Sequence, residues 1–549
     1  MNGATRRVRW GLFAVLVIGT GLCAGAVRSS AQNSAAAAPT GGIVRIALAK
    51  FDFDYLDPAL SLSVPVWALL DTTCARLLAY PDKAPPAALQ LQPEVAAGPP
   101  QVSRDAKTWT FTLRSGFRFS DGTPVRATAF ARAINRTLAP GVTSPAAQYT
   151  KDIVGADDVR SGKTTAASGV VARGNTLVVR FKRPVPDFAV RTTMSFFCAV
   201  PPSLPSDPEG VSAFPGAGPY YVADYRPGER ITIRRNPYYA GKRPHHVDGF
   251  DVDLTSSTQQ EVLDRIERDE ADWGYVLGPV ALEPGRGLVA KYGINKSQFF
   301  IKPGYSLRML VFNSSRPLFK NNPKLRRAVN MALNRRAIIS AVSSIVTDRL
   351  TDQYLPPDLP GFRNANIYPL DHANVTEARK LARGNLRGGK ATFYVPNFPP
   401  PLAVAQAAKA QLAEIGLDVE LKPIPFHITS SGYLGKLGLR DEPWDISLVL
   451  WTDVVDPYGY INVLFDKRFI GSTNLARFES TKYDTLMRQA ARLQGASRYR
   501  AYGKLDVELA RDAAPLAALG FLSESTLVSK RVGCKVLRPV LDLTTICLN

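Results

Sequence analysis

The sequence is poor in the residues and motifs that carry most enzymatic and metal chemistry. Its 549 residues include four histidines, and no CxxC pair is present. The motifs G-x-S-x-G, H-E-x-x-H and S-x-x-K with its partner sequences are also absent. These absences argue against a thiol-redox site, a zinc ribbon and the hydrolases that those motifs mark.

After the N-terminal segment, no part of the chain approaches about 18 consecutive apolar residues. The N-terminal run, Gly11–Cys23, follows three arginines and precedes small residues, a pattern that predicts a signal peptide over residues 1–31. Residues 32–42 are predicted to form a flexible tether. We therefore expect an exported, periplasmic or otherwise extracytoplasmic protein, soluble or membrane-associated. An uncleaved membrane anchor is the alternative, and Leu22 before Cys23 argues against a lipid anchor.

Cysteine is scarce, with five in the whole chain. Cys23 would leave with the signal peptide, and the even number that remains suggests disulfides in an exported protein. Among the pairings that these cysteines allow, we prefer Cys74–Cys198, joining a helical segment to a distant strand, with Cys534–Cys547 closing a short C-terminal loop. Buried free thiols are the alternative.

Acidic residues are outnumbered, 47 against 68 basic ones, so the formal net charge is +21. Removal of residues 1–31 takes four arginines away and leaves +17. A basic exported protein could meet an anionic membrane or ligand. The charges are spread along the chain, however, so we expect a solvated basic surface and no nucleic-acid partner.

The most informative stretch that is present is Asp445–Phe465. Its short apolar run, Ile446–Leu450, has the length of a buried strand and ends in Trp451-Thr-Asp453. Ligands collect outside the carboxyl ends of strands in α/β sheets, which makes this a candidate site. An ordinary strand-to-turn corner is the alternative, and Asp456 before Pro457 is predicted to cap the turn.

The chain is too long for one core, so two or three domains are expected. Hydrophobic periodicity predicts α/β structure, with strands at 43–50, 109–114, 177–181 and 446–450 and helices at 64–80, 127–138 and 325–333. On the last helix, Leu325 and Val329 are predicted to face the core, with Arg326, Arg327 and Asn330 outside.

Six ordered motifs between residues 43 and 549 carry a resemblance to a known family. They are Trp109–Pro124, Gly216–Tyr220, Arg234–Tyr239, Asp269–Trp273, Phe312–Asn334 and Leu402–Val419. The sequence resembles the extracytoplasmic solute-binding proteins of ABC importers, in the peptide/nickel-binding cluster (family 5) that includes dipeptide- and oligopeptide-binding proteins.

The resemblance implies a two-lobe periplasmic-binding-protein fold of class α/β, with an extra inserted domain and a hinge between the lobes. Residues 43–75, 210–303 and 515–549 would form domain I, residues 76–209 domain II, and residues 304–514 domain III. Pro303-Gly304 and Ala513-Ala514-Pro515 are plausible hinge crossings.

The function that the resemblance implies is capture of a small solute, most simply a dipeptide or oligopeptide, and its delivery to a membrane permease by a monomer without cofactor or catalysis. Asp453 would pair with the ligand ammonium, although its spacing from Trp451 is one residue shorter than in the family. The arginine that holds the ligand carboxylate in dipeptide binders is missing from Tyr394–Pro400. The expected pocket residues are Asp453, Trp451, Asn397, Phe398, Ser63, Val64, Trp67 and Tyr149.

Other ligands and functions stay open at this point. A nickel chelate or haem would need histidines, and His245-His246 is predicted to be solvent-exposed, while His372 and His427 stand alone. An oligosaccharide is a further ligand class. An exported hydrolase could use Asp453 and Asp456, but their spacing before a proline favours one ligand contact and one turn cap. A basic surface or adhesion protein is the third class.

Overall fold

The computed structural model describes residues 39–549, except for residues 82, 84–86, 277–281, 343–347, 426–432, 454 and 535–542. The predicted signal peptide, and the tether up to residue 38, lie outside the described residues. Within the described part, no helix is both long and apolar enough to cross a membrane.

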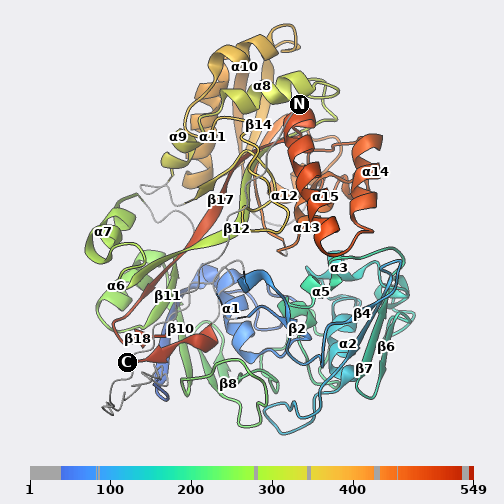
Figure 1. The fold of residues 1–549 in the computed structure, drawn as a ribbon. Helices are drawn as coiled ribbons and strands as arrows, with labels where there is room; N and C mark the ends of the chain where they lie inside the picture. Colours follow the sequence, from blue (N-terminus) through green and yellow to red (C-terminus); the bar gives the residue numbers. More distant parts are fainter. Residues whose placement is uncertain are drawn as a thin grey trace, which may run out of the picture. The chain divides into compact units, whose positions relative to one another are not determined.

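Most described strands belong to one mixed sheet of 11 strands (Figure 1). Its main path runs through β15 (Asp418–Ile424), β14 (Lys390–Pro396), β16 (Ile446–Trp451), β12 (Phe299–Phe312), β17 (Leu516–Val528), β11 (Trp273–Val276), β1 (Ile43–Ala49), β10 (Gly249–Ser256), β9 (Arg230–Arg235) and β8 (Tyr220–Arg226), with β13 (Arg349–Leu350) beside β17. The long antiparallel pair β12 and β17 belongs to both halves of this sheet.

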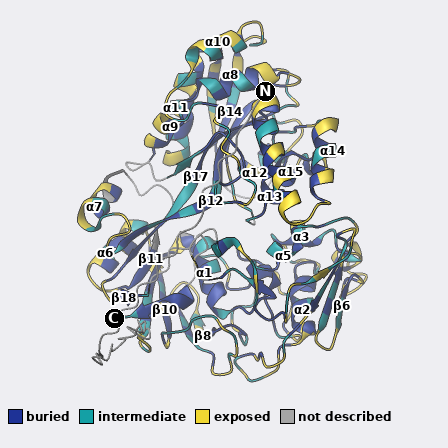
Figure 2. Cartoon of the chain, viewed as in Figure 1, coloured by how far each residue is buried: buried dark blue, intermediate teal, exposed yellow. Residues whose placement is uncertain are grey.

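The two faces of the β14–β16–β12 half follow from strand alternation, because successive side chains point to opposite faces. Met309 and Val311 pack with one core and Leu310 and Phe312 with another. The first core is covered by α12 (Tyr433–Gly438), α13 (Pro457–Phe465), α14 (Thr481–Ala490) and α15 (Gly495–Glu508). The second is covered by α8 (Pro323–Ala332), α9 (Arg335–Ser340), α10 (Val375–Ala382) and α11 (Pro399–Ala413), whose exposed residues face away from the sheet in Figure 2.

The β1–β10–β11 half has its own helices. These are α1 (Val64–Thr73) in one core, and α6 (Gln259–Glu267) and α7 (Leu282–Tyr292) in another. The short 3-10 helices are η1 (Lys50–Asp52), η2 (Ala87–Leu89), η3 (Ser195–Phe197), η4 (Lys467–Phe469) and η6 (Leu543–Thr545), and η5 (Leu509–Ala513) is a short π-helix.

A separate four-stranded sheet has a core of its own. Its order is β4 (Gln101–Val102), β5 (Thr108–Thr112), β7 (Thr176–Arg180) and β6 (Val170–Arg173), accompanied by α2 (Ala127–Arg136), α3 (Ala147–Thr150), α4 (Ala156–Arg160) and α5 (Phe188–Arg191). Trp109 and Phe111 are buried here and alternate with threonines, as the pattern predicted. Two small pairs, β2 (Leu78–Ala79) with β3 (Gln92–Pro93) and β18 (Val532–Gly533) with β19 (Cys547–Leu548), complete the described strands.

The helix predicted over residues 64–80 is wrong in its second half, because α1 ends at Thr73. The Thr73 carbonyl accepts a hydrogen bond from the backbone N–H of Gly218 at 2.9 Å, and Arg243 donates to the carbonyls of Asp71 and Cys74. A side chain on Gly218 would meet the backbone of this turn at 2.5 Å, so glycine permits the approach. Tertiary partners thus replace the next helical turn.

The prediction of a polar outer face for α8 is also wrong for Arg326 and Asn330, which are buried. Arg326 donates to the carbonyl oxygens of Phe319 and Ala513, and Asn330 donates to that of Leu516. Buried polar groups need such partners. These contacts fasten α8 to the segment that enters β17.

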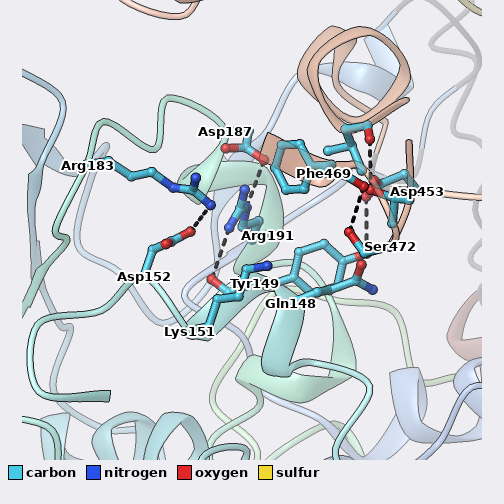
Figure 3. A pocket seen from close by; sticks show the side chains of 12 residues that line it. Gln148, Tyr149, Lys151, Asp152, Arg183, Asp187, Arg191, Asp453, Phe469 and Ser472 are labelled. Carbon is cyan, nitrogen blue, oxygen red and sulfur yellow. Dashed lines mark hydrogen bonds and ion pairs between the residues drawn. The ribbon is translucent and has the colours of Figure 1, made fainter. Parts of the chain in front are cut away.

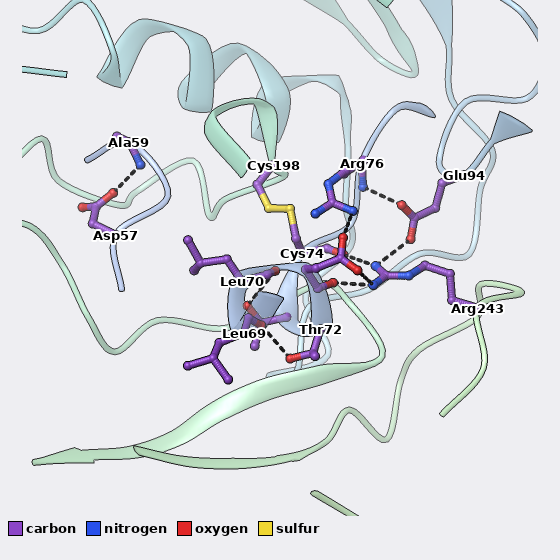
Figure 4. The surroundings of a disulfide bond; sticks show 12 residues. Asp57, Ala59, Leu69, Leu70, Thr72, Cys74, Arg76, Glu94, Cys198 and Arg243 are labelled. Carbon is purple, nitrogen blue, oxygen red and sulfur yellow. Dashed lines mark hydrogen bonds and ion pairs between the residues drawn. A yellow bond between two sulfur atoms is a disulfide. The ribbon is translucent and has the colours of Figure 1, made fainter. Parts of the chain in front are cut away.

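The structure joins Cys74 to Cys198 and Cys534 to Cys547, the pairing preferred from the sequence, with Cα–Cα distances of 5.5 and 5.3 Å. Cys198 was expected on a strand, but it follows the short helix η3 instead. Figure 4 shows Arg243 beside Cys74 and Glu94. Its guanidinium forms ion pairs with the carboxylates of Asp71 (2.8 Å) and Glu94 (3.4 Å).

Pro303-Gly304 lies where the pairing of β12 with β17 shifts register, and Ala514 has a positive φ of 46° just before β17. Irregular backbone thus occurs within β12 and immediately before β17, the two strands shared by the halves of the sheet. The domain boundaries given above stay predictions.

Candidate functional site

The site begins where β16 ends. Trp451 is the last residue of the strand, and its indole N–H donates to the carbonyl of Gly459 in α13 at 3.2 Å. Asp453 follows and also lies against Gly459, where an added Cβ would come within 2.8 Å of its Cγ. Glycine at 459 therefore leaves the space that the Asp453 carboxylate occupies.

Asp456 holds the start of α13, as its position before Pro457 predicted. Its side chain accepts from the backbone N–H of Tyr458 at 2.8 Å. The same carboxylate binds Arg498 of α15 with two contacts of 2.8 and 2.5 Å, and both side chains are buried. Asp456 thus stabilises the helices that support the site, whereas Asp453 is the carboxylate that lines the pocket.

Tyr149 of α3 reaches Asp453 from the four-stranded sheet's core. Its hydroxyl donates to Oδ1 of Asp453 at 3.2 Å. Burial, with the nearby Asp453 charge, raises the pKa of Tyr149 well above its ordinary value. The phenol therefore stays protonated and serves as a hydrogen-bond donor.

A pocket lies around this contact, lined by residues from two separate stretches of the chain (Figure 3). With its opening to solvent it encloses about 490 Å³. One stretch contributes Gln148, Tyr149, Lys151, Asp152, Arg183, Asp187 and Arg191, and the other contributes Asp453, Val463, Phe469, Ser472 and Thr473. Most of the lining residues are therefore of polar or charged type.

Arg191 is the most connected cation of the lining. Its Nε donates to Asp187 at 2.7 Å, and its guanidinium donates to the backbone carbonyl of Tyr149 at 3.0 Å. The guanidinium carbon lies 5.4 Å from the Tyr149 ring centroid and 6.0 Å from that of Tyr458. Although burial alone would lower the pKa of Arg191, the carboxylates of Asp187 and Asp453 raise it, so this residue stays charged.

Phe469 of η4 receives two cations from the facing stretch. The Lys151 ammonium and the Arg183 guanidinium carbon each lie 5.6 Å from its ring centroid. Arg183 also forms an ion pair with Asp152. Cation–π contacts of this kind stabilise by about 0.5–1 kcal/mol each when partly exposed.

Of the residues expected in the pocket, Tyr149 and Asp453 are in its lining and Trp451 lies beside it. Trp67 of α1 makes an edge contact with Phe196 at 5.7 Å, and Phe196 lies 6.4 Å from Tyr149, so an aromatic row connects α1 to the site. Ser63 and Val64 are half-buried at the start of α1.

Asn397 and Phe398 follow β14 and are both exposed. Because β14 and β16 are parallel neighbours, with Tyr394 opposite Ser447, their carboxyl ends meet at the same edge of the sheet. Neither Asn397 nor Phe398 is in the pocket lining. A ligand contact at this edge stays a prediction for both.

The sequence reasoning missed the charged side of the pocket, namely Lys151, Asp152, Arg183, Asp187 and Arg191. These residues lie in turns and short helices between elements, where no periodic pattern marks them. The available signal was the charged residues that flank the Pro-rich segment at 184–186.

The histidines are not arranged as a metal site in the part of the chain that the structure describes, where no group of three or more ligating residues is found. The predicted exposure of His245 and His246 is wrong, because both are half-buried. The His245 ring packs edge-on against Tyr239 at 5.7 Å. His427 lies outside the described residues.

The fold has known counterparts. It matches a clavulanic acid biosynthesis oligopeptide-binding protein with a TM-score of 0.83 at 24% identity, covering 93% of this chain and 96% of the other. It matches the unliganded open form of a periplasmic murein tripeptide-binding protein with a TM-score of 0.74 at 19% identity, covering 93% and 99%. The architecture is therefore the multi-domain, two-lobe α/β fold of periplasmic binding proteins.

The family follows from the sequence match. Residues 90–472 match the model of the bacterial extracellular solute-binding proteins, family 5. The chain belongs to this family, as the motif resemblance predicted.

Two curated relatives extend over most of the chain. A probable D,D-dipeptide-binding periplasmic protein of Escherichia coli is 24% identical over 449 residues, 79% of this chain and 80% of its own length. The oligopeptide-binding protein of Bacillus subtilis is 25% identical over 410 residues, 71% and 72% of the two chains. Both relatives are named as binding proteins.

Proposed function

We propose that this protein is the peptide-binding component of an ABC importer, which captures a short peptide outside the cytoplasm and delivers it to a membrane permease. The observation that carries the proposal is the Asp453 carboxylate at the end of β16, in a pocket built by two separate stretches of chain. A carboxylate in such a place favours a ligand ammonium, because a charge-assisted hydrogen bond offsets its desolvation.

Binding would act by shifting an equilibrium between open and closed arrangements of the lobes. The contacts across the pocket from Tyr149 to Asp453, from Lys151 and Arg183 to Phe469, and from Arg191 to Tyr458 are of the kind that a closed form uses. Each is individually weak, so the ligand supplies the decisive free energy. The protein works as a periplasmic monomer and has no chemical step.

The direct test is a titration of the mature protein with a mixture of dipeptides, followed by intrinsic fluorescence. Trp451 contacts α13 beside the pocket, so its emission should change saturably as ligand fills the site. Mass spectrometry of the same sample should recover the peptides intact. Cleaved peptides would support an exported hydrolase, and the absence of any saturable change would contradict a peptide binder.

A further inference from the structure

The pocket contains a cation whose charge is not compensated by the protein. Three cations and three carboxylates line it. Arg183 pairs with Asp152, and Arg191 pairs with Asp187. Across the described ranges, the half-buried Lys151 ammonium forms no ion pair and donates no hydrogen bond to a side chain. An ammonium has three donors, so Lys151 can take up an anionic group.

Lys151 is also held in position. The Phe469 ring lies 5.6 Å from its ammonium nitrogen and belongs to the stretch that carries Asp453 into the pocket. The backbone carbonyl of Lys151 accepts a hydrogen bond from the Lys182 ammonium at 3.4 Å, and this contact fixes the turn after α3. Lys151 and Asp453 thus present opposite charges to one pocket.

The stretch around the end of β14 is another place for a ligand carboxylate, and it supplies no cation of its own. The stretch Tyr394–Pro400 has no arginine, and Asn397 and Phe398 are outside the lining.

Asp187 is a buried carboxylate of the pocket lining. It is 2% exposed, and its Oδ2 accepts from Arg191. Its Oδ1 is buried and accepts no hydrogen bond in the described structure. A buried acceptor of this kind costs about 1–3 kcal/mol unless a donor such as a ligand N–H reaches it.

From this arrangement, and resting on the proposed peptide-binding function, the geometry points to Lys151 as the residue that holds the ligand's terminal carboxylate. The ligand is then a short zwitterion with its ammonium at Asp453, its carboxylate at Lys151 and an N–H near Asp187. An extended residue spans about 3.4 Å, so one small pocket holds both charges of a di- or tripeptide and not those of a long peptide.

The test compares an equimolar dipeptide mixture with the same mixture bearing C-terminal amides, using ultrafiltration and mass spectrometry of the retained peptides. Wild-type protein should bind the free acids at least about tenfold more tightly than the amides. Lys151→Gln should bind the two mixtures alike, at the affinity of wild type for the amides. Lys163→Gln removes the same charge from an exposed lysine and should behave as wild type.

The outcomes separate the two proposals. Equal binding of acids and amides by wild type would overturn the role of Lys151 and leave the peptide-binding function standing. Discrimination that survives in Lys151→Gln would do the same. Failure of wild type to retain either mixture would overturn both proposals. Circular dichroism of Lys151→Gln should match wild type, because a half-buried lysine without an ion pair contributes little to folding.

Discussion

At the residue scale, the site depends on how closely Asp453 lies against α13. Gly459 is the residue that makes room for it, since an added Cβ would approach Cγ of Asp453 to 2.8 Å and Oδ2 to 3.0 Å. Glycine inside a helix costs about 0.5–1 kcal/mol relative to alanine. Its presence in α13 therefore has a local reason, which is the placement of the carboxylate.

Gly459→Ala should lower peptide affinity about tenfold while leaving the melting temperature unchanged or slightly higher. The methyl group displaces Asp453, whereas the gain in helix propensity offsets the local strain. Gly287→Ala on α7 is the matched control, because nothing lies within 4 Å of its added Cβ. Unchanged affinity in Gly459→Ala would mean that the position of Asp453 does not govern binding.

Some features of the site could be predicted from the sequence. The apolar run before Trp451 and Asp453 predicted a strand with a carboxylate at its end. The proline after Asp456 predicted a capped turn, which the structure shows to be the start of helix α13. Lys151 and Arg191 could not be predicted to share a pocket with Asp453, because more than 250 residues separate each of them from it and only the tertiary fold joins them. Arg326 was misplaced because the carbonyl of Ala513, to which it donates, lies 187 residues away in sequence.

At the scale of elements, helix ends depend on partners that periodicity does not reveal. The apolar spacing of residues 64–80 continues past Thr73, but Arg243 and Gly218 take the carbonyls there and Cys74 turns toward Cys198. In contrast, α8 starts with a local cap, in which the side chain of Asn322, just before Pro323, accepts from the N–H of Leu325 at 3.3 Å. Local caps are visible in sequence, and long-range caps are not.

Helix α15 also carries a buried acid that makes stability depend on pH. Burial raises the pKa of Asp506 to about 7, against the lowering effect of hydrogen bonds from the backbone of Tyr354 and the side chain of Gln353. The folded state thus keeps a proton that the unfolded chain loses near pH 4. The stabilisation is complete below about pH 4 and is lost as the pH rises toward 7.

Asp506→Asn should therefore flatten the fall in the free energy of unfolding between about pH 4 and 7, measured by urea denaturation at several pH values. Asp418→Asn, on the exposed start of β15, is the control and should keep the wild-type slope. An unchanged slope in Asp506→Asn would show that another group sets the pH dependence.

At the scale of the whole molecule, β12 and β17 are shared by the two halves of the large sheet. Irregular backbone occurs at Gly304 within β12 and at Ala514 just before β17. Irregular points on otherwise continuous strands are where a hinge can absorb changes in φ and ψ. These are the two places at which the domain division implied by the family resemblance put the hinge. The extent of the sheet was not predictable, because its strands come from segments far apart in the chain.

Small-angle X-ray scattering should show a smaller radius of gyration when wild-type protein is saturated with the dipeptide mixture. Ligand contacts on both sides of the pocket favour the closed form, so compaction follows binding. Asp453→Ala, at the same peptide concentration, should show little compaction. A basic surface or adhesion protein would show no ligand-dependent change in either sample.

The central claim is that Asp453 binds the ammonium of a peptide ligand. The measurement that tests it most directly is the affinity of wild type and of Asp453→Ala for dipeptides with free or acetylated amino termini. Wild type should bind the free peptides about 100-fold more tightly than the acetylated ones, and Asp453→Ala should lose that preference with little change in its free energy of unfolding. If Asp453→Ala binds the free peptides as wild type does, the assignment of Asp453 and the peptide ligand is contradicted.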